Sequence, residues 1–208
     1  MKPLRVLGLE PYYGGSHRAF LDGWMRHSRH EWTVLGLPAY KWKWRMRHAP
    51  MHFARKVAER FSTGCDWDVL WCSDMLDLAS FRGLAPEGVR ALPCLLYFHE
   101  NQLTYPLPRE ADRDYGYAMI HLSSALAATA VRFNSAFHRD AFLDALRALL
   151  RRMPDHRPLE AVDAARRKAG VQPPGIAPIA PRAERRPGPP RLLWAARWEY
   201  DKRPDVFF

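Results

Sequence analysis

The sequence predicts an α/β fold, a Rossmann-like, doubly wound parallel sheet with helices on both faces. Three observations favour it. Short apolar runs alternate with segments of helical periodicity, the best of these runs end in polar or glycine-rich sequence, and 48% of the 208 residues are hydrophobic against 26% charged. Alternating strands and helices are typical of a parallel sheet, and this composition can bury a sizeable core.

The first predicted unit is a strand, a glycine loop and a helix. The apolar run over 4–9 has the pattern of a strand, and Gly14 and Gly15 follow it closely. The apolar residues of the next segment recur with helical spacing and share one face: Phe20, Leu21, Trp24 and Met25. This order predicts a tight connection from strand to helix.

The alternation continues to residue 150. A strand over 32–37 precedes a helix that carries Phe53, Val57 and Phe61 at intervals of four residues. The remaining predicted strands are 69–72, 94–98 and 131–133, and the remaining predicted helices are 117–130 and 137–150.

The composition changes after residue 150, because half of the 18 prolines fall between Pro154 and Pro190. We therefore predict an N-terminal domain over 1–150 and a Pro/Arg-rich linker region over 151–190, with one helix near 159–168.

The last segment, 191–208, is predicted to begin a second domain. Residues 191–197 have the pattern of a buried strand, 198–202 that of a loop, and Pro204 suits the first position of a helix. One strand and one turn of helix cannot bury their own apolar faces, so the chain is interpreted as a fragment with an incomplete second domain. The alternative is that strand 191–197 joins the first sheet.

The length excludes a large multidomain machine, and the charge indicates an anionic partner. The net charge of +10 divides into +8 over 1–60, −4 over 61–140 and +6 over 141–208. Nucleic acid, a nucleotide or a membrane surface would each suit this layout. No N-terminal apolar run is long enough for a signal peptide or a membrane span, so we expect a cytoplasmic protein. The cysteines form no CxxC pair and are expected to be reduced core residues: Cys65, Cys72 and Cys94.

Gly14, Gly15 and Ser16 form a candidate binding loop. Bare backbone N–H groups at the start of a helix favour an anion, and the neighbouring tyrosines and His17 make a binding loop more attractive. The alternative is a turn that needs glycine at positive φ. The loop does not match GxGxxG, so a dinucleotide site is not indicated.

A second candidate is the segment after strand 94–98, with His99, Glu100 and Asn101. These side chains can hydrogen-bond a polar substrate, and the alternative is a histidine that caps the strand. A zinc-protease HExxH motif is excluded because residue 103 is Leu103, and no other metal-ligand, GxSxG or P-loop spacing occurs. The sequence therefore predicts no metal site.

Two further strands also end in polar pairs, Ser73-Asp74 and Asn134-Ser135. Because the carboxyl ends of parallel strands meet at one edge of a sheet, these pairs are expected near the glycine loop and near His99. Ligands of open α/β sheets bind at that edge.

The stretch over 41–48 alternates bases with aromatic or apolar residues. Its members are Lys41, Trp42, Lys43, Trp44, Arg45, Met46, Arg47 and His48. Stacking faces beside phosphate-pairing charges predict contact with unstacked nucleotides of RNA. The alternative is an edge or loop whose tryptophans face the core, and a basic membrane helix fits the two-residue period less well.

Six segments, in their order, resemble family-4 glycosyltransferases of the GT-B fold and, more closely, the tRNA-queuosine α-mannosyltransferase family. They are LEPYYGGSHRAFLDGW, PAYKWKWRMRHAP, SDMLDLASFRGL, YFHENQLTYP, RFNSAFHRDAFL and RWEYDKRP. The resemblance covers nearly all of 4–150 and resumes at 171–208. It implies that this chain is the N-terminal, acceptor-side domain of a GT-B enzyme with a truncated second domain.

The resemblance also implies substrates and roles. The donor would be GDP-mannose, the acceptor queuosine in the anticodon loop of a tRNA, and transfer would be retaining and independent of metal. His99 would contact the sugar at the reacting centre, and Arg197 and Lys202 would grip the donor diphosphate. The other implied donor or substrate contacts are Gly14, Gly15, Ser16, Glu100, Asn101, Asn134 and Ser135.

Three interpretations of function stay open at this point. The first is the queuosine mannosyltransferase, of which this fragment alone is expected to be inactive. The second is a family-4 transferase acting on a glycan or lipid, and the third is an inactive, truncated RNA-binding module. One departure from the family-4 pattern is Ala177 after Pro-Pro-Gly-Ile, where many members carry an acidic residue.

Overall fold

The computed structural model of the chain describes residues 2–64, 66–176, 178–180 and 188–208. Within it the chain divides into two compact units. The first consists of the chain up to Tyr105 together with Asp114–Gly175, and the second consists of Pro106–Arg113 together with the chain from Ile176. The sheet lies entirely in the first unit.

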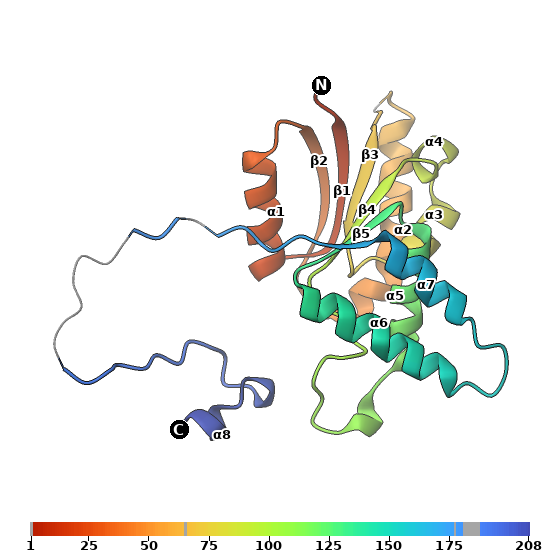
Figure 1. Ribbon diagram of the computed structural model, residues 1–208. Helices are drawn as coiled ribbons and strands as arrows, with labels where there is room; N and C mark the ends of the chain where they lie inside the picture. Colours follow the sequence, from red (N-terminus) through yellow and green to blue (C-terminus); the bar gives the residue numbers. More distant parts are fainter. Residues whose placement is uncertain (1, 65, 177, 181–187) are drawn as a thin grey trace. The chain divides into compact units, whose positions relative to one another are not determined.

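A six-stranded, all-parallel sheet forms the centre of the first unit, in the order β2-β1-β3-β4-β5-β6 (Figure 1). The strands are β1 Arg5–Tyr13, β2 Glu31–Pro38, β3 Val69–Ser73, β4 Cys94–Phe98, β5 Ala130–Phe133 and β6 Ala169–Val171. The predicted α/β fold with a Rossmann-like parallel sheet is therefore confirmed. From β1 the sheet grows to β2 on one side and to β3 on the other, so the topological switch point lies between β1 and β3.

Helices cover both faces of this sheet (Figure 1). They are α1 Gly15–His27, α2 Trp42–Phe61, α3 Leu78–Leu84, α4 Glu87–Arg90, α5 Tyr115–Ala127, α6 Ala136–Arg151 and α7 Leu159–Lys168. The α1 helix packs on one face through Leu21, with Phe20 and Trp24 beside it. The other face is covered by apolar side chains of α2, α3, α5, α6 and α7, which form the larger core.

The period-two alternation of each strand explains the two cores. Along β3, Leu70 and Cys72 enter the larger core, and the intervening Trp71 enters the aromatic core under α1. Along β4, Leu96 enters the larger core and Tyr97 the aromatic one. Side chains of successive strand residues point to opposite faces, so a strand buried on both faces is an almost continuous apolar run.

The sequence did not predict the short helices α3 and α4, and the other elements differ from the expected ones mainly at three places. The first strand continues past residue 9 to Tyr13, and α2 begins at Trp42, inside the stretch whose alternation suggested an edge or loop. The predicted helix near 159–168 is present as α7, but it is followed by β6, which the sequence did not reveal. Three residues with a single valine give too weak a pattern to identify a strand, and pairing with β5 stabilises it.

The second unit does not contain the predicted strand. Residues 191–197 form no strand, and Leu192 and Leu193 are 82% and 85% exposed. A strand needs a neighbouring strand to pair with, and the described part of this unit supplies none. An aromatic cluster of Trp194, Trp198 and Phe208 gathers beside α8, which is Pro204–Phe207 and begins at the predicted proline.

Some sequence predictions concern residues outside the described ranges, namely Cys65, Ala177 and part of the linker region 151–190. The other two cysteines, Cys72 and Cys94, are free thiols in the core, as expected. Among the described residues, no helix has both the length and the apolar character needed to cross a membrane.

Candidate active site

Glu10 is fully buried in β1 and links the two strands at the switch point. Because Leu9 pairs with Cys72, the following residues Glu10 and Ser73 lie side by side at the carboxyl ends of their strands. The Ser73 hydroxyl donates to Glu10 Oε1 at 2.9 Å, and the Tyr12 backbone N–H donates to the same oxygen at 2.9 Å. These bonds fix the carboxylate and leave Oε2 facing His17.

The glycine loop needs its two glycines for different reasons. Gly14 is extended, but a Cβ atom there would lie 2.5 Å from Cβ of Ala39, so only glycine fits. Gly15 has a φ of +52°, in the left-handed region that favours glycine, and a Cβ atom there would meet nothing. The turn interpretation of the loop is therefore supported. Gly15 and Ser16 lie at the start of α1, where both are exposed, and anion binding stays a prediction.

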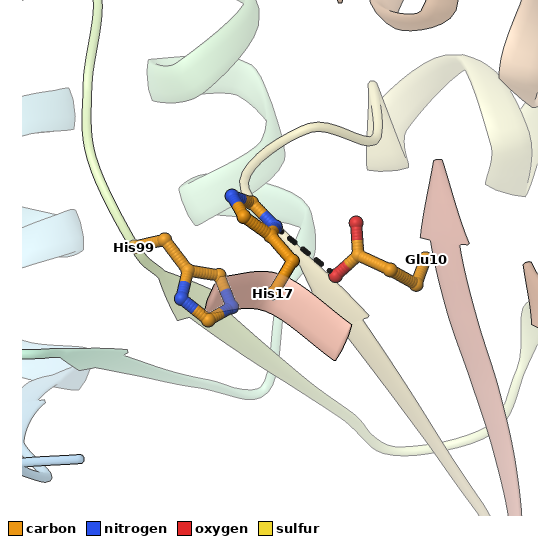
Figure 2. A group of neighbouring side chains, drawn as sticks. All are labelled: Glu10, His17 and His99. Atoms are coloured by element: carbon orange, nitrogen blue, oxygen red, sulfur yellow. Dashed lines mark ion pairs between the residues drawn. The ribbon is translucent and has the colours of Figure 1, made fainter. Parts of the chain in front are cut away.

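His17 and His99 face each other beside Glu10 (Figure 2). The ring centroids lie 4.0 Å apart with planes tilted by 34°, and His17 Nδ1 lies 3.4 Å from Glu10 Oε2. His17 comes from the first turn of α1 and His99 from the residue after β4. Figure 2 shows the three side chains gathered in one place, although His99 is far from the other two in the sequence.

The two imidazoles differ in their affinity for a proton. Burial lowers the pKa of His17, but the polar contact and the charge of Glu10, with two further carboxylates, outweigh burial and raise it above its usual value. Burial lowers the pKa of His99 to about 2, and the charges of His17 and His138 act in the same direction. His99 is therefore neutral at physiological pH and can donate or accept a hydrogen bond at its ring.

The backbone of His99 is held by side chains from the two neighbouring strand ends. Asp74, after β3, accepts from the His99 N–H at 2.8 Å, and Asn134, after β5, donates to the His99 carbonyl at 2.7 Å. Burial raises the pKa of the Asp74 carboxyl to about 8, and the nearby Glu100 carboxylate adds to the rise. We call Asp74 and Asn134 the His99 clamp.

The side chains of Asn134 and Ser135 were predicted to bind substrate, but in the structure they make hydrogen bonds within the protein. Ser135 caps α6 by accepting from the His138 N–H at 3.1 Å, and its hydroxyl donates to Asn134 Oδ1 at 3.1 Å. Asn134 Oδ1 also lies 3.1 Å from His138 Nδ1. These contacts make the pair a support for His99, and direct contact with a ligand stays a prediction.

The loop after His99 is ordered by its own polar side chains. Asn101 is buried and accepts from the Thr104 N–H at 2.8 Å, and its amide donates to the Thr104 hydroxyl at 2.8 Å. Glu100 is half-buried and accepts from Gln102 Nε2 at 3.0 Å. Glu100 thus keeps a carboxylate near His17, and Asn101 shapes the loop.

Sequence reasoning missed Glu10 and His138. The predicted first strand ended at residue 9, so Glu10 was not recognised as a buried strand residue at the switch point. A lone carboxylate directly after a short apolar run, next to a glycine loop, was the available signal. His138 gave no signal, because its contact with Asn134 depends on the first turn of α6.

The structure also brings together a group that sequence spacing did not reveal. One potential metal-ligating atom from each of Glu10, His17 and His99 lies within 4.8 Å of the other two. The sequence positions of these residues match no metal-binding motif, since they come from β1, α1 and the end of β4.

Lys41 is the N-cap residue of α2, and residues 42–48 lie in the first two turns of this helix. The helix turns Met46 into the core and places Trp42 against Tyr117 with ring centroids 5.1 Å apart, whereas Trp44 is 61% exposed. The period-two pattern therefore does not describe an extended segment. One tryptophan packs inward, as the alternative interpretation required, and the other is accessible for stacking.

The four bases of this stretch are partly or fully exposed and contact neighbouring rings or polar groups. Nζ of Lys41 lies 5.3 Å from the Tyr40 ring, and Nζ of Lys43 lies 5.6 Å from the Trp42 ring. Arg45 donates to the carbonyl of Pro38 at 3.0 Å.

Arg47 lies 4.9 Å from the Tyr117 ring and pairs with Asp114 at 3.6 Å. With Trp44, these four cations make up the basic surface at the start of α2, called the α2 basic face below: Lys41, Lys43, Trp44, Arg45 and Arg47. It extends around the helix, because Lys43 and Arg47 lie on one side and Lys41 and Arg45 on the other. The α2 basic face belongs to the first unit and packs beside α5.

Arg197 and Lys202 lie in the second unit. Arg197 is exposed and pairs with Glu199 at 4.0 Å, and Lys202 pairs with Asp201 at 2.8 Å in a short 3₁₀ turn, Tyr200–Lys202. The Tyr200 hydroxyl donates to the carbonyl of Pro106, which ties the two segments of this unit together. A role of Arg197 and Lys202 in holding a diphosphate stays a prediction.

The chain matches known proteins over nearly its whole length. The sequence model of a family described as "tRNA-queuosine alpha-mannosyltransferase N-terminal" matches residues 5–176. A tRNA-queuosine α-mannosyltransferase of Drosophila melanogaster is 34% identical over 213 residues, which cover 97% of this chain and 55% of the relative. The chain therefore spans about half the length of that relative.

Proposed function

The chain belongs to the tRNA-queuosine α-mannosyltransferase family, and we propose that it forms the acceptor-side part of an enzyme that transfers mannose to queuosine in a tRNA anticodon loop. The donor in this proposal is GDP-mannose, and the anomeric configuration is retained. We also propose that the enzyme has the GT-B fold and acts in the cytoplasm.

The observation that carries the proposal is the convergence of polar groups at the switch point. The glycine loop, Glu10, Asp74 and the His17–His99 pair come from three strand ends and meet where open α/β sheets bind ligands. Packing of the hydrophobic core does not require such a cluster, and buried polar groups lower the stability of the fold unless they are paired. A polar ligand such as a sugar would supply the missing hydrogen bonds.

In the proposed complex, the His99 ring contacts the mannose at the reacting centre. Gly14, Gly15 and Ser16 lie against the donor phosphates. Gly15 and Ser16 offer backbone N–H groups, whereas the Gly14 N–H donates to the Tyr12 carbonyl at 2.8 Å. Glu100 accepts a hydrogen bond from a sugar hydroxyl. His99 is suited to its role because it is neutral, has a buried Nε2 without a partner among the described residues, and is fixed by the clamp.

Arg197 and Lys202 are proposed to act on the leaving group. The departing GDP gains negative charge in the transition state, and fixed cations stabilise that charge more than they stabilise the bound donor. Two cations would supply this stabilisation without a metal ion, so we propose that transfer itself is metal-independent.

The α2 basic face is proposed to hold the tRNA. It offers four cations for phosphates and the exposed ring of Trp44 for an unstacked base. This proposal predicts that the logarithm of tRNA affinity falls linearly with the logarithm of salt concentration, with a slope proportional to the number of phosphates bound.

The function is tested with the full-length gene product, GDP-mannose and queuosine-containing tRNA. We expect a mannosylated nucleoside in the digested tRNA by mass spectrometry, an α-linked sugar by NMR, and no loss of product in EDTA. Absence of product across all nucleotide sugars, with queuosine-tRNA still bound, would support the inactive RNA-binding module. Transfer to a glycan or lipid but not to tRNA would support the second interpretation.

The tRNA surface is tested by removing charges from α2. Lys43→Ala with Arg47→Ala should weaken tRNA binding and lower the slope of log K against log salt by about 0.7–0.9 for each phosphate that is no longer neutralised. Arg60→Ala, an exposed base near the end of the same helix, is the matched control and should leave the slope unchanged. Equal effects of both changes would contradict a specific basic face.

A further inference from the structure

We propose that Glu10, His17 and His99 form a binding site for a divalent transition-metal ion of the zinc class. The three residues supply one carboxylate oxygen and two imidazole nitrogens, and one such atom from each lies within 4.8 Å of the others (Figure 2). Two histidines and one carboxylate are a ligand set used by zinc in proteins. Mg²⁺ and Ca²⁺ prefer oxygen ligands alone, so the donor set disfavours them.

The spacing of the donor atoms is close to that of a bound ion. In a tetrahedral zinc site with bonds of about 2.0–2.2 Å, neighbouring ligand atoms lie roughly 3.4 Å apart. His17 Nδ1 and Glu10 Oε2 are already separated by 3.4 Å. Closing the remaining separations requires side-chain movements of the order of 1 Å, well within the reach of rotation of an imidazole ring.

Each of the three proposed ligands has a potential metal-ligating atom that makes no hydrogen bond with the protein. Glu10 Oε2, His17 Nδ1 and His99 Nε2 are buried, and none has a hydrogen-bond partner among the described residues. His17 and Glu10 meet only as an ion pair. Buried polar atoms are nearly always hydrogen-bonded in native folds, so a cluster in which two atoms meet only as an ion pair and the third has no partner indicates a ligand.

Supporting groups hold the ligands in place. Glu10 Oε1 is occupied by the Ser73 hydroxyl and the Tyr12 N–H, which turns Oε2 toward His17. The backbone of His99 is held by the His99 clamp from both sides. Such outer contacts are typical of metal sites, where they fix the orientation of the first ligands.

The surrounding charge favours a cation. The carboxylates of Glu10 and Glu100 both act electrostatically on His17. Glu10 is itself a proposed ligand and Glu100 is half-buried nearby, and negative charge of this kind attracts a divalent ion.

A metal ion here would engage the His99 ring, which the proposed function assigns to the sugar. Zinc and the nucleotide sugar would then compete, so zinc would inhibit transfer and a chelator would restore it. This consequence rests on the proposed function, whereas the binding site itself does not.

The site is tested by titrating Zn²⁺ into the chelator-stripped 208-residue chain against a competing chromophoric chelator, and by the absorption spectrum of bound Co²⁺. We expect one ion bound per chain at this site and a Co²⁺ spectrum of low coordination number. Glu10→Gln, His17→Ala and His99→Ala should each weaken binding by at least about 10–100-fold. His17 lies in the first turn of α1, outside the strands of the sheet, so its replacement gives a second test if a variant at Glu10 does not fold.

The matched control is the double variant His48→Ala, His52→Ala, which removes a histidine pair four residues apart on α2. It should bind zinc as the original chain does. Absence of zinc binding in the original chain, or binding lost only in the control, would overturn the site. Retained zinc binding with no mannose transfer under any condition would contradict the proposed function and leave the site standing.

Discussion

The polar groups at the two ends of the sheet differ in their exposure to water and in their hydrogen bonding. At the amino end, Arg5 donates to Asp68 from its backbone at 2.7 Å and from its guanidinium at 2.9 Å, and both side chains are partly exposed. The amino end of β2 is tied in the same way, because His30 Nδ1 accepts from the Leu4 N–H at 3.1 Å. Each of these groups has a partner and contact with water.

At the carboxyl end the polar groups are buried and under-partnered. Glu10 and Asp74 are essentially inaccessible, and each has one carboxylate oxygen without a hydrogen bond among the described residues. His17 pairs with Glu10 and stacks on His99, and the Nε2 atom of His99 has no hydrogen-bond partner among the described residues. The paired groups at the amino end stabilise the fold. The unpaired groups at the carboxyl end lower its stability, and a bound ligand that hydrogen-bonds them would offset this loss.

The largest expected effect is a loss of mannose transfer in the variant His99→Ala, which changes a residue at the carboxyl end of the sheet. In the full-length gene product, this change should lower kcat for mannose transfer by about 10²-fold or more, since it removes the hydrogen bond that the proposed function places at the reacting centre. The measurement is nucleoside mannosylation under single-turnover conditions, with circular dichroism to verify folding.

The control for this change lies at the opposite end. His30→Ala also removes a partly buried histidine with a backbone contact, and it should leave kcat within about twofold of the original. If both variants lost activity equally, the contrast between the two ends of the sheet would be wrong.

The second effect concerns the His99 clamp. Asn134→Asp keeps an acceptor for Ser135 and His138 but cannot donate to the His99 carbonyl. We expect about a tenfold loss of kcat with little change in KM for tRNA, and a loss of about 1–3 kcal/mol in the free energy of unfolding for the unsatisfied carbonyl. Urea unfolding and steady-state kinetics measure the two quantities. A raised KM with unchanged kcat would indicate substrate contact and not positioning.

The sequence predicted the elements of the first unit well because its signals are local. The strand over 94–98 and the helix over 159–168 agree with the structure at both ends, since an apolar run or a helical period defines each of them. The parallel sheet followed from their alternation. The predicted strand over 191–197 failed because an apolar run becomes a strand only where another strand can pair with it.

The site was predictable only as a set of strand ends. His99 and Asp74 could be placed at one edge of the sheet because parallel strands share a direction. Three features of the site depend on strand register and side-chain rotamers: the stacking of His17 on His99, the burial of Glu10, and the hydrogen bond from Asn134 to the His99 carbonyl. Neither is encoded in local spacing, so the sequence predicted that Asn134 binds substrate but could not show its bonds to the protein.

The third effect concerns pH. His121 is fully buried between Phe98 and Phe142, and burial, with the charge of His138, lowers its pKa to about 3. The unfolded chain binds a proton near pH 6.5, so His121 destabilises the fold progressively as pH falls below that value, by about 2 kcal/mol at pH 5.

His121→Leu should therefore flatten the decline of unfolding free energy between pH 7 and pH 5 by about that amount. The measurement is urea unfolding at several pH values. His27→Leu, at an exposed position on α1, is the control and should keep the original slope. An unchanged slope for His121→Leu would show that this buried histidine takes up its proton in the folded state as readily as in the unfolded chain.

The smallest effect is expected for Asp68→Asn at the amino end. The hydrogen bonds from Arg5 hold the pKa of Asp68 at about 2, so the ion pair persists over the physiological range. Both groups are in contact with solvent, which screens the pair, and the neutral amide can still accept from the Arg5 backbone N–H. We expect a shift in Tm of the order of 2 °C and unchanged transfer. A loss of transfer here would mean that the amino end communicates with the site through β1, because Arg5 and Glu10 lie on that one strand.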